Sequence, residues 1–391
     1  MGSYRGTRSR SYLFFSAALL ICLLYLTYSA RSALFHIPDS LPATPRVAIH
    51  DTRNRTLGFQ KVFAIGFENR VDKRDAITIG SSLSEFDVDW SGGVRFADIP
   101  KKAIAETWDF NELPNSTHAA WRAHLNLLRH IVNERIQTAL IMEDDTDWDW
   151  FLKDQLDAFA ESAGALQETG LRPRSPYGDS WHALWLGHCR LGPNSAPQDV
   201  HFLSNDITVP PVGFRHSIWR QGRIPPELFS NDTRAVFRAH GGMCTYAYAI
   251  TYEGAQKIIT SLSLMADAAP FDVAMSAMCR QAHLAPFNCY GIHPPIFASH
   301  RFAGSKSRDS DLMSYEVAAK HPEFTWDIVY SVLQNAPRLL SGATTVASQW
   351  PNDTRYAEID KDETLQLRRD IRNIKWQDIP MTKIKGVNSF D

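Results

Sequence analysis

The stretch Thr138-Ala-Leu-Ile-Met-Glu143-Asp144-Asp145 decides the expected fold, because an apolar run ends there in three consecutive carboxylates. The apolar residues 139–142 are typical of a buried strand in a parallel sheet. The acids then fall at the carboxyl end of that strand, where open α/β sheets bind ligands. Adjacent acids repel one another, so we expect a cation between them. The stretch therefore predicts an α/β domain with a divalent metal site.

A helix with an apolar stripe precedes this strand. Ser116 or Thr117 can cap a helix that runs to about residue 135. Its apolar residues recur at helical spacing, at Trp121, Leu125, Leu128 and Val132. A helix that leads directly into a strand is typical of doubly wound α/β sheets. The same patterns predict strands at 61–66, 182–186 and 245–251 and helices at 77–83, 150–160 and 255–262.

The alternation of strands and helices is expected throughout, apart from one long segment. Residues 191–226 carry six prolines and little periodicity, so we expect a long substrate-facing loop there. The chain has 391 residues, of which 44% are hydrophobic and 21% charged, as in folded globular proteins. A net charge of −2 excludes the basic footprint of a nucleic-acid-binding protein.

The N-terminus has the pattern of a membrane anchor. Residues 12–30 contain no charged side chain and suffice, at about 1.5 Å per residue, to span a membrane core of about 30 Å. Arginines precede the segment, so the positive-inside rule places the N-terminus in the cytoplasm. A cleaved signal peptide is the alternative, but its apolar core is usually only about 7–15 residues long. We expect a tail (1–11), a transmembrane signal anchor (12–30), a stem (31–58), a folded domain (59–315) and a C-terminal extension packed on or following it (316–391).

Lumenal exposure of the body agrees with two further patterns. Four N-x-S/T sequons allow N-glycosylation, at Asn54, Asn115, Asn231 and Asn352. Outside the anchor the chain has an even number of cysteines, which permits two disulfides and leaves three pairings open. These cysteines are Cys189, Cys244, Cys279 and Cys289.

Two other metal sites are excluded by spacing. A calcium loop that begins at Asp145 has Trp150 where such loops need glycine. His118, His124 and His130 follow one another at six-residue intervals, which turns each by about 120° from the last on a helix, so they do not form a metal triad. Asp147 and Asp149 fit the start of the helix at 150–160.

The helix and acidic strand resemble the centre of glycosyltransferase family 25, which includes bacterial lipooligosaccharide and animal collagen galactosyltransferases. The resemblance comprises His124 within the helix, the E-D-D strand end at 143–145 and the basic turn Arg70-Val-Asp72-Lys73-Arg74. It extends through the segments 184–187 and 245–255 and covers about 61–310. Gly66 stands where the family usually has asparagine. Membrane-anchored fungal members are similar to this chain.

The resemblance implies a Rossmann-like GT-A fold and a metal-dependent, inverting hexosyltransferase. The favoured donor is UDP-galactose, the acceptor is a glycan or glycoprotein, and the cofactor is Mn²⁺ or another divalent cation. The expected location is the Golgi or another secretory-pathway membrane, as a single-pass type II glycoprotein with a lumenal catalytic domain.

Site residues follow from the resemblance and from the chemistry. Hard carboxylate oxygens suit the metal, so Asp145 and Glu143 are the expected ligands. The donor-binding candidates are Arg70, Asp72, Arg74, His124, Glu143 and Asp144. Asp272 lies at the distance where the family has an acid of the same type, and it is the expected general base, with helix capping as its alternative role. His300 and His293 are candidates for a late metal or phosphate contact.

Two other functions stay open. A glycoside hydrolase needs two carboxylates that flank a sugar, without a metal. A catalytically silent glycan-binding protein needs aromatic side chains that stack on sugars. Candidates for such stacking are Trp148, Trp150, Trp181, Trp185 and Trp219.

Overall fold

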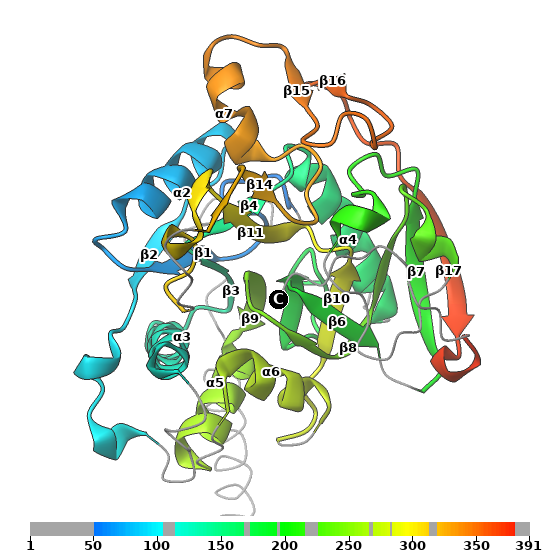
Figure 1. Ribbon diagram of the computed structural model, residues 1–391. Helices are drawn as coiled ribbons and strands as arrows, with labels where there is room; N and C mark the ends of the chain where they lie inside the picture. The colour runs from blue at the N-terminus through cyan, green and yellow to red at the C-terminus, as the bar shows by residue number, and fades with distance from the viewer. Residues whose placement is uncertain are drawn as a thin grey trace, which may run out of the picture. The chain divides into compact units, whose positions relative to one another are not determined.

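A large mixed β-sheet organises the folded part of the chain (Figure 1). The computed structural model describes residues 51–104, 114–167, 173–193, 196–215, 226–265, 269–281, 284–312 and 319–379. All of them belong to one of two units into which the chain divides, Ile49–Asp391. No helix within these described ranges is long and apolar enough to cross a membrane. The predicted tail and anchor lie outside them.

The described helices and strands have the following bounds. The helices are α2 (Val71–Leu83), α3 (Asn115–Asn133), α4 (Leu152–Leu166), α5 (Tyr252–Ile259), α6 (Phe271–Cys279) and α7 (Val332–Leu340). The strands are β1 (Lys61–Gly66), β2 (Asp89–Gly92), β3 (Thr138–Glu143), β4 (Thr146–Trp148), β5 (Ala183–Gly187), β6 (Arg190–Pro193), β7 (Gln198–Ser204), β8 (Arg234–Met243), β9 (Ala247–Thr251), β10 (Cys289–His293), β11 (Phe297–Arg301), β12 (Gly304–Ser305), β13 (Lys320–His321), β14 (Phe324–Thr325), β15 (Thr345–Ala347), β16 (Glu358–Asp360) and β17 (Arg368–Ile374).

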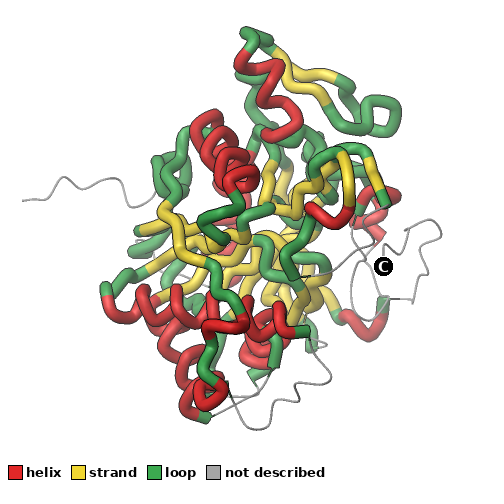
Figure 2. The backbone as a smooth tube through the Cα atoms, turned by 60° about the vertical axis from the view of Figure 1, so that its left-hand side comes forward, coloured by secondary structure: helices red, strands yellow, loops and turns green. Residues whose placement is uncertain are grey.

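The sheet is covered by helices on both faces because successive side chains of a strand point to opposite sides. In β1, Phe63 and Ile65 belong to one hydrophobic core, whereas Val62 and Ala64 belong to another. The first core contains the predicted α3 stripe and residues of α5 and α6, and the second contains residues of α2 and α4. Figure 1 shows α3, α5 and α6 together below the sheet and α2 and α7 above it, and Figure 2 shows helices on both sides of the strands. The chain is therefore an α/β protein, as predicted.

The strand order corrects the prediction of uniform parallel alternation. The main path is β17-β7-β8-β10-β5-β9-β3-β1-β2. β1 pairs in parallel with β2 and β3, but β9 is inserted antiparallel between β3 and β5. Between α4 and α5, the described strands β5 to β9 follow one another without an intervening α-helix. The alternation of strands and helices therefore holds only for the first part of the domain.

The proline-rich segment is not the predicted long loop. Its described residues form β6 and β7, which both pair antiparallel with β8. Pro193 is the last residue of β6 and follows an irregularity in the pairing of β6 with β8, whereas the other described prolines of the segment lie outside β7. None of the described residues between 191 and 226 lines the cavity described below.

Both ends of the predicted domain pack more extensively than the sequence indicates. On the N-terminal side, Leu57 is fully buried, and its carbonyl accepts a hydrogen bond from the Tyr177 hydroxyl at 2.6 Å. On the C-terminal side, β17 pairs with β7 over its whole length and forms an edge of the main sheet. Residues from about 51 onward and the extension up to 379 therefore belong to one folded unit.

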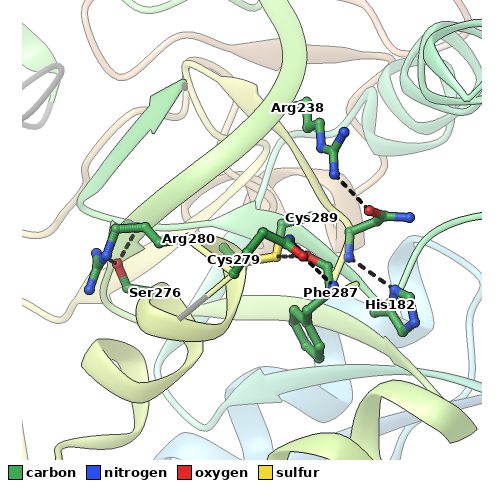
Figure 3. Close-up of a disulfide and its surroundings, with 10 residues drawn as sticks. His182, Arg238, Ser276, Cys279, Arg280, Phe287 and Cys289 are labelled. Carbon is green, nitrogen blue, oxygen red and sulfur yellow. Dashed lines mark hydrogen bonds between the residues drawn. A yellow bond between two sulfur atoms is a disulfide. The ribbon is translucent and has the colours of Figure 1, made fainter. Parts of the chain in front are cut away.

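Two disulfides confirm the expectation from the cysteine count. Cys189 is bonded to Cys244, and Cys279 is bonded to Cys289. The first links the end of β5 to the turn between β8 and β9. The second links the end of α6 to β10, beside Phe287 (Figure 3).

Candidate functional site

A cavity of about 350 Å³ opens at the carboxyl ends of the parallel strands β1 and β3. The three consecutive acids form part of its wall, together with Gly66 at the end of β1. Opposite the strands lie small residues of α3, among them Ala119 and Ala123. The segment 310–312 contributes a further wall. The site therefore lies where the strand pattern predicted it.

The three acids bind different partners although they are consecutive in the chain. The Glu143 carboxylate accepts a hydrogen bond from the Thr245 hydroxyl at 2.8 Å. Asp144 forms an ion pair with the Lys73 ammonium at 2.8 Å. The Asp145 carboxylate is bound by Arg301 at 2.6 Å. The three side chains therefore meet different environments within one site.

These environments separate the acidities of the three groups. Burial, assisted by the negative charge of Asp145, raises the pKa of Glu143 to about 8. Burial also raises the pKa of Asp144 to about 6, against the opposing charge of Lys73. Burial disfavours the charge of Asp145 as well, but Arg301 and Lys73 outweigh it, so its pKa is lowered. Arg301 and Lys73 therefore favour the ionised form of Asp145, whereas burial favours the protonated form of Glu143.

The arrangement of the side chains and their chemistry differ in how well they suit a metal ion at Glu143 and Asp145. No group of three or more His, Cys, Asp or Glu side chains in the described ranges is arranged to hold a metal ion. The chemistry of Glu143 and Asp145 nevertheless suits a hard divalent cation, since both offer carboxylate oxygens. A cation there would also relieve the repulsion that raises the pKa of Glu143. These two acids fit a cation by charge and by donor type.

Lys73, which is buried, is a site residue for which the sequence predicted no role, as are Thr245, Arg301 and Asp311. It belongs to α2, which begins at Val71 and not at the predicted residue 77. Lys73 shares the buried face of that helix with Ile77, four residues later, and only 4% of its side chain is exposed. Burial disfavours its charge, but Asp145 and Asp144 outweigh this effect and raise the pKa of the ammonium. The four-residue spacing to Ile77 is the sequence signal that could have placed Lys73 on the inward face.

The predicted donor-binding residues of the basic turn do not line the cavity. Arg70 binds both oxygens of Asp72, at 3.0 and 2.9 Å, and also forms an ion pair with Asp311. Arg74 lies over the Trp90 ring, 4.0 Å from its centroid. Arg70 thus lies beside the site, through Asp311, whereas Arg74 is engaged on an aromatic face.

His124 lines the cavity as a neutral group. Its Nδ1 lies 3.0 Å from the Tyr248 hydroxyl, and its ring stacks on Phe271 with a centroid distance of 4.3 Å. Burial lowers its pKa to about 3. His124 therefore contributes hydrogen-bonding capacity to the site and no positive charge at neutral pH.

Asp272 lies in the first turn of α6 and is half-buried. One carboxylate oxygen accepts the backbone N–H of Cys244 at 2.9 Å, and the other accepts the N–H of Val273 at 2.8 Å. Its charge contributes to the raised pKa of Glu143. Asp272 is not among the residues that line the cavity, and its carboxylate holds two backbone N–H groups without being the N-cap of α6, which is Pro270.

The two late histidines have separate surroundings. His300 is buried, with Nδ1 2.8 Å from the Thr325 hydroxyl, and its backbone N–H donates to the carbonyl of Asp145 at 2.7 Å. His293 is buried and stacks on His188 at a centroid distance of 5.8 Å. Neither ring lines the cavity. His300 supports Asp145 through its backbone.

Asp147 and Asp149 differ from the prediction that they open a helix, since α4 begins only at Leu152. Asp147 is buried in β4 and accepts a hydrogen bond from the Thr325 hydroxyl at 2.8 Å. Asp149 accepts the backbone N–H groups of Phe151 and Tyr330 at 3.0 and 2.9 Å. Both acids bind the C-terminal extension to the sheet, an arrangement that local sequence does not reveal.

Three of the four sequons present an exposed asparagine, at Asn115, Asn231 and Asn352. Asn54 is half-buried, and its side-chain oxygen accepts the backbone N–H groups of Thr56 and Gly58 at 2.9 and 3.0 Å.

A scan against protein-family models and a search of curated proteins find no match to this chain.

Proposed function

We propose that this chain is a glycosyltransferase of GT-A fold that moves a hexose from a nucleotide-sugar to a glycan or glycoprotein. The observation that carries the proposal is the cavity at the carboxyl ends of β1 and β3, where Glu143, Asp144 and Asp145 lie beside Lys73. Ligands of open α/β sheets bind at this end of the strands. UDP-galactose is the favoured donor, and Mn²⁺ the favoured cofactor.

The residues of the site have distinct roles in this proposal. Mn²⁺ held by Glu143 and Asp145 would supply Lewis-acid stabilisation of the charge on a departing nucleotide diphosphate. Arg301 fixes the Asp145 carboxylate, and Thr245 fixes that of Glu143. Asp272 is the proposed base that removes the proton of the acceptor hydroxyl.

His124 and the alanines of α3 complete the proposed donor site. A neutral imidazole can donate or accept a hydrogen bond to an uncharged part of the ligand without repelling a cation nearby. Ala119 and Ala123 leave space beside the strands. The cavity, at about 350 Å³, falls within the range of about 300–1,000 Å³ for small-molecule sites.

A glycoside hydrolase is the second candidate, because one observation favours it. The pKa of Glu143 is raised to about 8, whereas that of its neighbour Asp145 is lowered. A protonated acid beside an ionised carboxylate is the pair that glycoside hydrolysis requires. A glycan-binding protein is less favoured, because Trp148, Trp181 and Trp185 are buried and the ring N–H of the half-buried Trp150 is bound to the Lys361 carbonyl at 2.8 Å. Trp219 lies outside the described residues.

The test uses purified full-length protein in detergent with a panel of nucleotide-sugars and Mn²⁺. A transferase releases nucleotide diphosphate, a hydrolase releases free sugar from a glycan, and a binding protein releases neither. Asp145→Asn should lower donor turnover by orders of magnitude. Asp89→Asn, which removes an exposed acid of β2 paired with Lys61, is the matched control and should leave turnover unchanged. Normal manganese-dependent turnover in the Asp145 variant would contradict the proposed ligand.

A further inference from the structure

Asp311 lies between two basic side chains at the start of α2. Its carboxylate accepts a hydrogen bond from the Lys73 ammonium at 2.7 Å and forms an ion pair with Arg70. Lys73 is almost completely buried, whereas one third of the Asp311 side chain is exposed. Asp311 therefore contacts Lys73 and Arg70 from the solvent-exposed side of the site and supplies a negative charge to both.

The segment that carries Asp311 covers one side of the cavity. Ser310, Asp311 and Leu312 line it. The carbonyl of Leu312 accepts the Ser116 hydroxyl of α3 at 2.6 Å, and the carbonyl of Arg308 accepts a hydrogen bond from Arg70 at 2.8 Å. These side-chain contacts hold the segment 308–312 against α2 and α3.

The other partners of the two cations lie on the body of the domain. Asp144 follows β3, and Asp72 lies within α2 next to Arg70. Without Asp311, the two basic side chains keep Asp144 and Asp72 as direct partners and the charge of Asp145 nearby, and the position of the Asp311 carboxylate is open to another anionic group. A phosphate group meets the same requirement as the carboxylate, since Lys and Arg bind both through charge-assisted hydrogen bonds.

We infer that the carboxylate of Asp311 occupies the place of an anionic group of the ligand, and that Lys73 and Arg70 form a phosphate subsite at this edge of the cavity. The inference rests on the proposed function, which requires a diphosphate in the site. Asp311 competes with that diphosphate, so the ligand binds only when the segment 308–312 releases the two cations. The contact is therefore autoinhibitory.

The experiment measures binding of inorganic pyrophosphate to the full-length protein by calorimetry, in EDTA. The chelator removes any contribution of a divalent cation at Glu143 and Asp145. Asp311→Asn keeps the shape of the side chain but removes its charge, so pyrophosphate should bind more tightly by a factor on the order of ten. Arg70→Gln should weaken binding in the wild-type background and abolish the gain in the Asp311 background.

Asp309→Asn is the matched control. Asp309 lies on the same segment but pairs with His321 at 2.8 Å, so its loss should leave pyrophosphate affinity at the wild-type value. Equal affinities of the wild type and the Asp311 variant, or weaker binding by the latter, would overturn the inference. A second titration with UDP distinguishes the source of the phosphate: a parallel gain ties the subsite to a nucleotide diphosphate, and a gain for pyrophosphate alone ties it to a free anion.

Failure of this inference is separable from failure of the proposed function. Metal-free pyrophosphate binding that responds to Asp311, in a protein that transfers no sugar, would support the subsite and reject the transferase. Manganese-dependent transfer in a protein whose metal-free anion binding ignores Asp311 would support the transferase and reject the subsite.

Discussion

Gly66 and Asp144 touch at the neighbouring ends of β1 and β3, so closely that a Cβ atom on Gly66 would lie 2.5 Å from the Asp144 carboxylate and its Cβ. Real Cβ atoms do not approach other atoms to this distance, and Asp144 is held from its other side by Lys73. Here a side chain would displace Asp144, so glycine and the acid depend on each other.

Gly66→Ala should therefore destabilise the protein and disrupt the site. Overpacking of this kind costs about 1–3 kcal/mol, and the loss of the pair between Lys73 and Asp144 adds to it. Denaturant unfolding measures the free energy, and nucleotide diphosphate release measures the activity. Gly92→Ala is the matched control, because Gly92 is the register partner of Gly66 on β2 and a Cβ there meets nothing within 4 Å. Equal stability of the two variants would show that Asp144 can move aside without loss.

The strands and helices around this contact were largely predictable. β1, β3 and α3 follow from local periodicity, since the predicted stripe of Trp121, Leu125 and Leu128 is the stripe that packs on the sheet. The place of the acids at the end of β3 follows from the same pattern. Local apolar pattern is therefore sufficient to locate this part of the site.

The missing features depend on contacts between distant segments. The apolar pattern of a strand such as β9 is the same whether the strand runs parallel or antiparallel to its neighbour. The sequence therefore could not show that β9 pairs antiparallel with β3. The prolines around β6 and β7 concealed two strands. Asp311 lies in an irregular segment, and its pairing with Lys73 spans more than two hundred residues of sequence. Such contacts are decided by the assembled fold.

The two disulfides should differ in their effect on stability and on the site. Cys189 and Cys244 are 55 residues apart, and Cys279 and Cys289 only 10. Chain-entropy estimates give about 4 kcal/mol for the longer loop and about 3 kcal/mol for the shorter one. Paired replacement by serine, followed by denaturant unfolding, should show the larger loss for Cys189 and Cys244.

The same pair of variants tests the site. Cys244 precedes Thr245, whose hydroxyl donates a hydrogen bond to Glu143. The backbone N–H of Cys244 donates to the Asp272 carboxylate. When the two variants are compared at equal fraction folded, replacement of Cys189 and Cys244 should therefore lower transferase activity more than replacement of Cys279 and Cys289 does. Identical activities of the two double variants would show that the disulfide does not position these acids.

Glu143 should make the stability of the metal-free protein depend on pH. Its folded-state pKa is raised from 4.5 to about 8, so the folded state binds the proton more tightly than the unfolded state. The stability from this group is present below pH 4.5 and is lost as the pH rises to about 8. Asp144 and Asp149, with pKa values raised to about 6 and about 7, act in the same direction at lower pH.

Glu143→Gln should flatten the stability curve, most clearly near pH 8, where Glu143 still titrates and the other two acids, with pKa values of about 6 and about 7, have largely lost their protons. The glutamine oxygen can still accept the Thr245 hydroxyl, so the fold should survive. Urea unfolding in EDTA at a series of pH values gives the curves. A slope above pH 7 that is the same in both proteins would assign the pH dependence to another group.

Asp272→Asn decides whether Asp272 is the general base or only supports the first turn of α6. The asparagine oxygen can still accept one of the two backbone N–H groups, from Cys244 or Val273, so the helix should persist. If Asp272 takes the proton of the acceptor, kcat should fall by about 10²–10⁴-fold while donor and Mn²⁺ binding stay unchanged. Thr251→Ala is the matched control, because it removes the cap of α5 that accepts the Gly254 N–H at 3.0 Å, costs about 1 kcal/mol of stability and should leave kcat intact. A normal kcat in the Asp272 variant, with a stability loss like that of the Thr251 variant, would leave Asp272 as a structural support of α6 and assign the base to another residue.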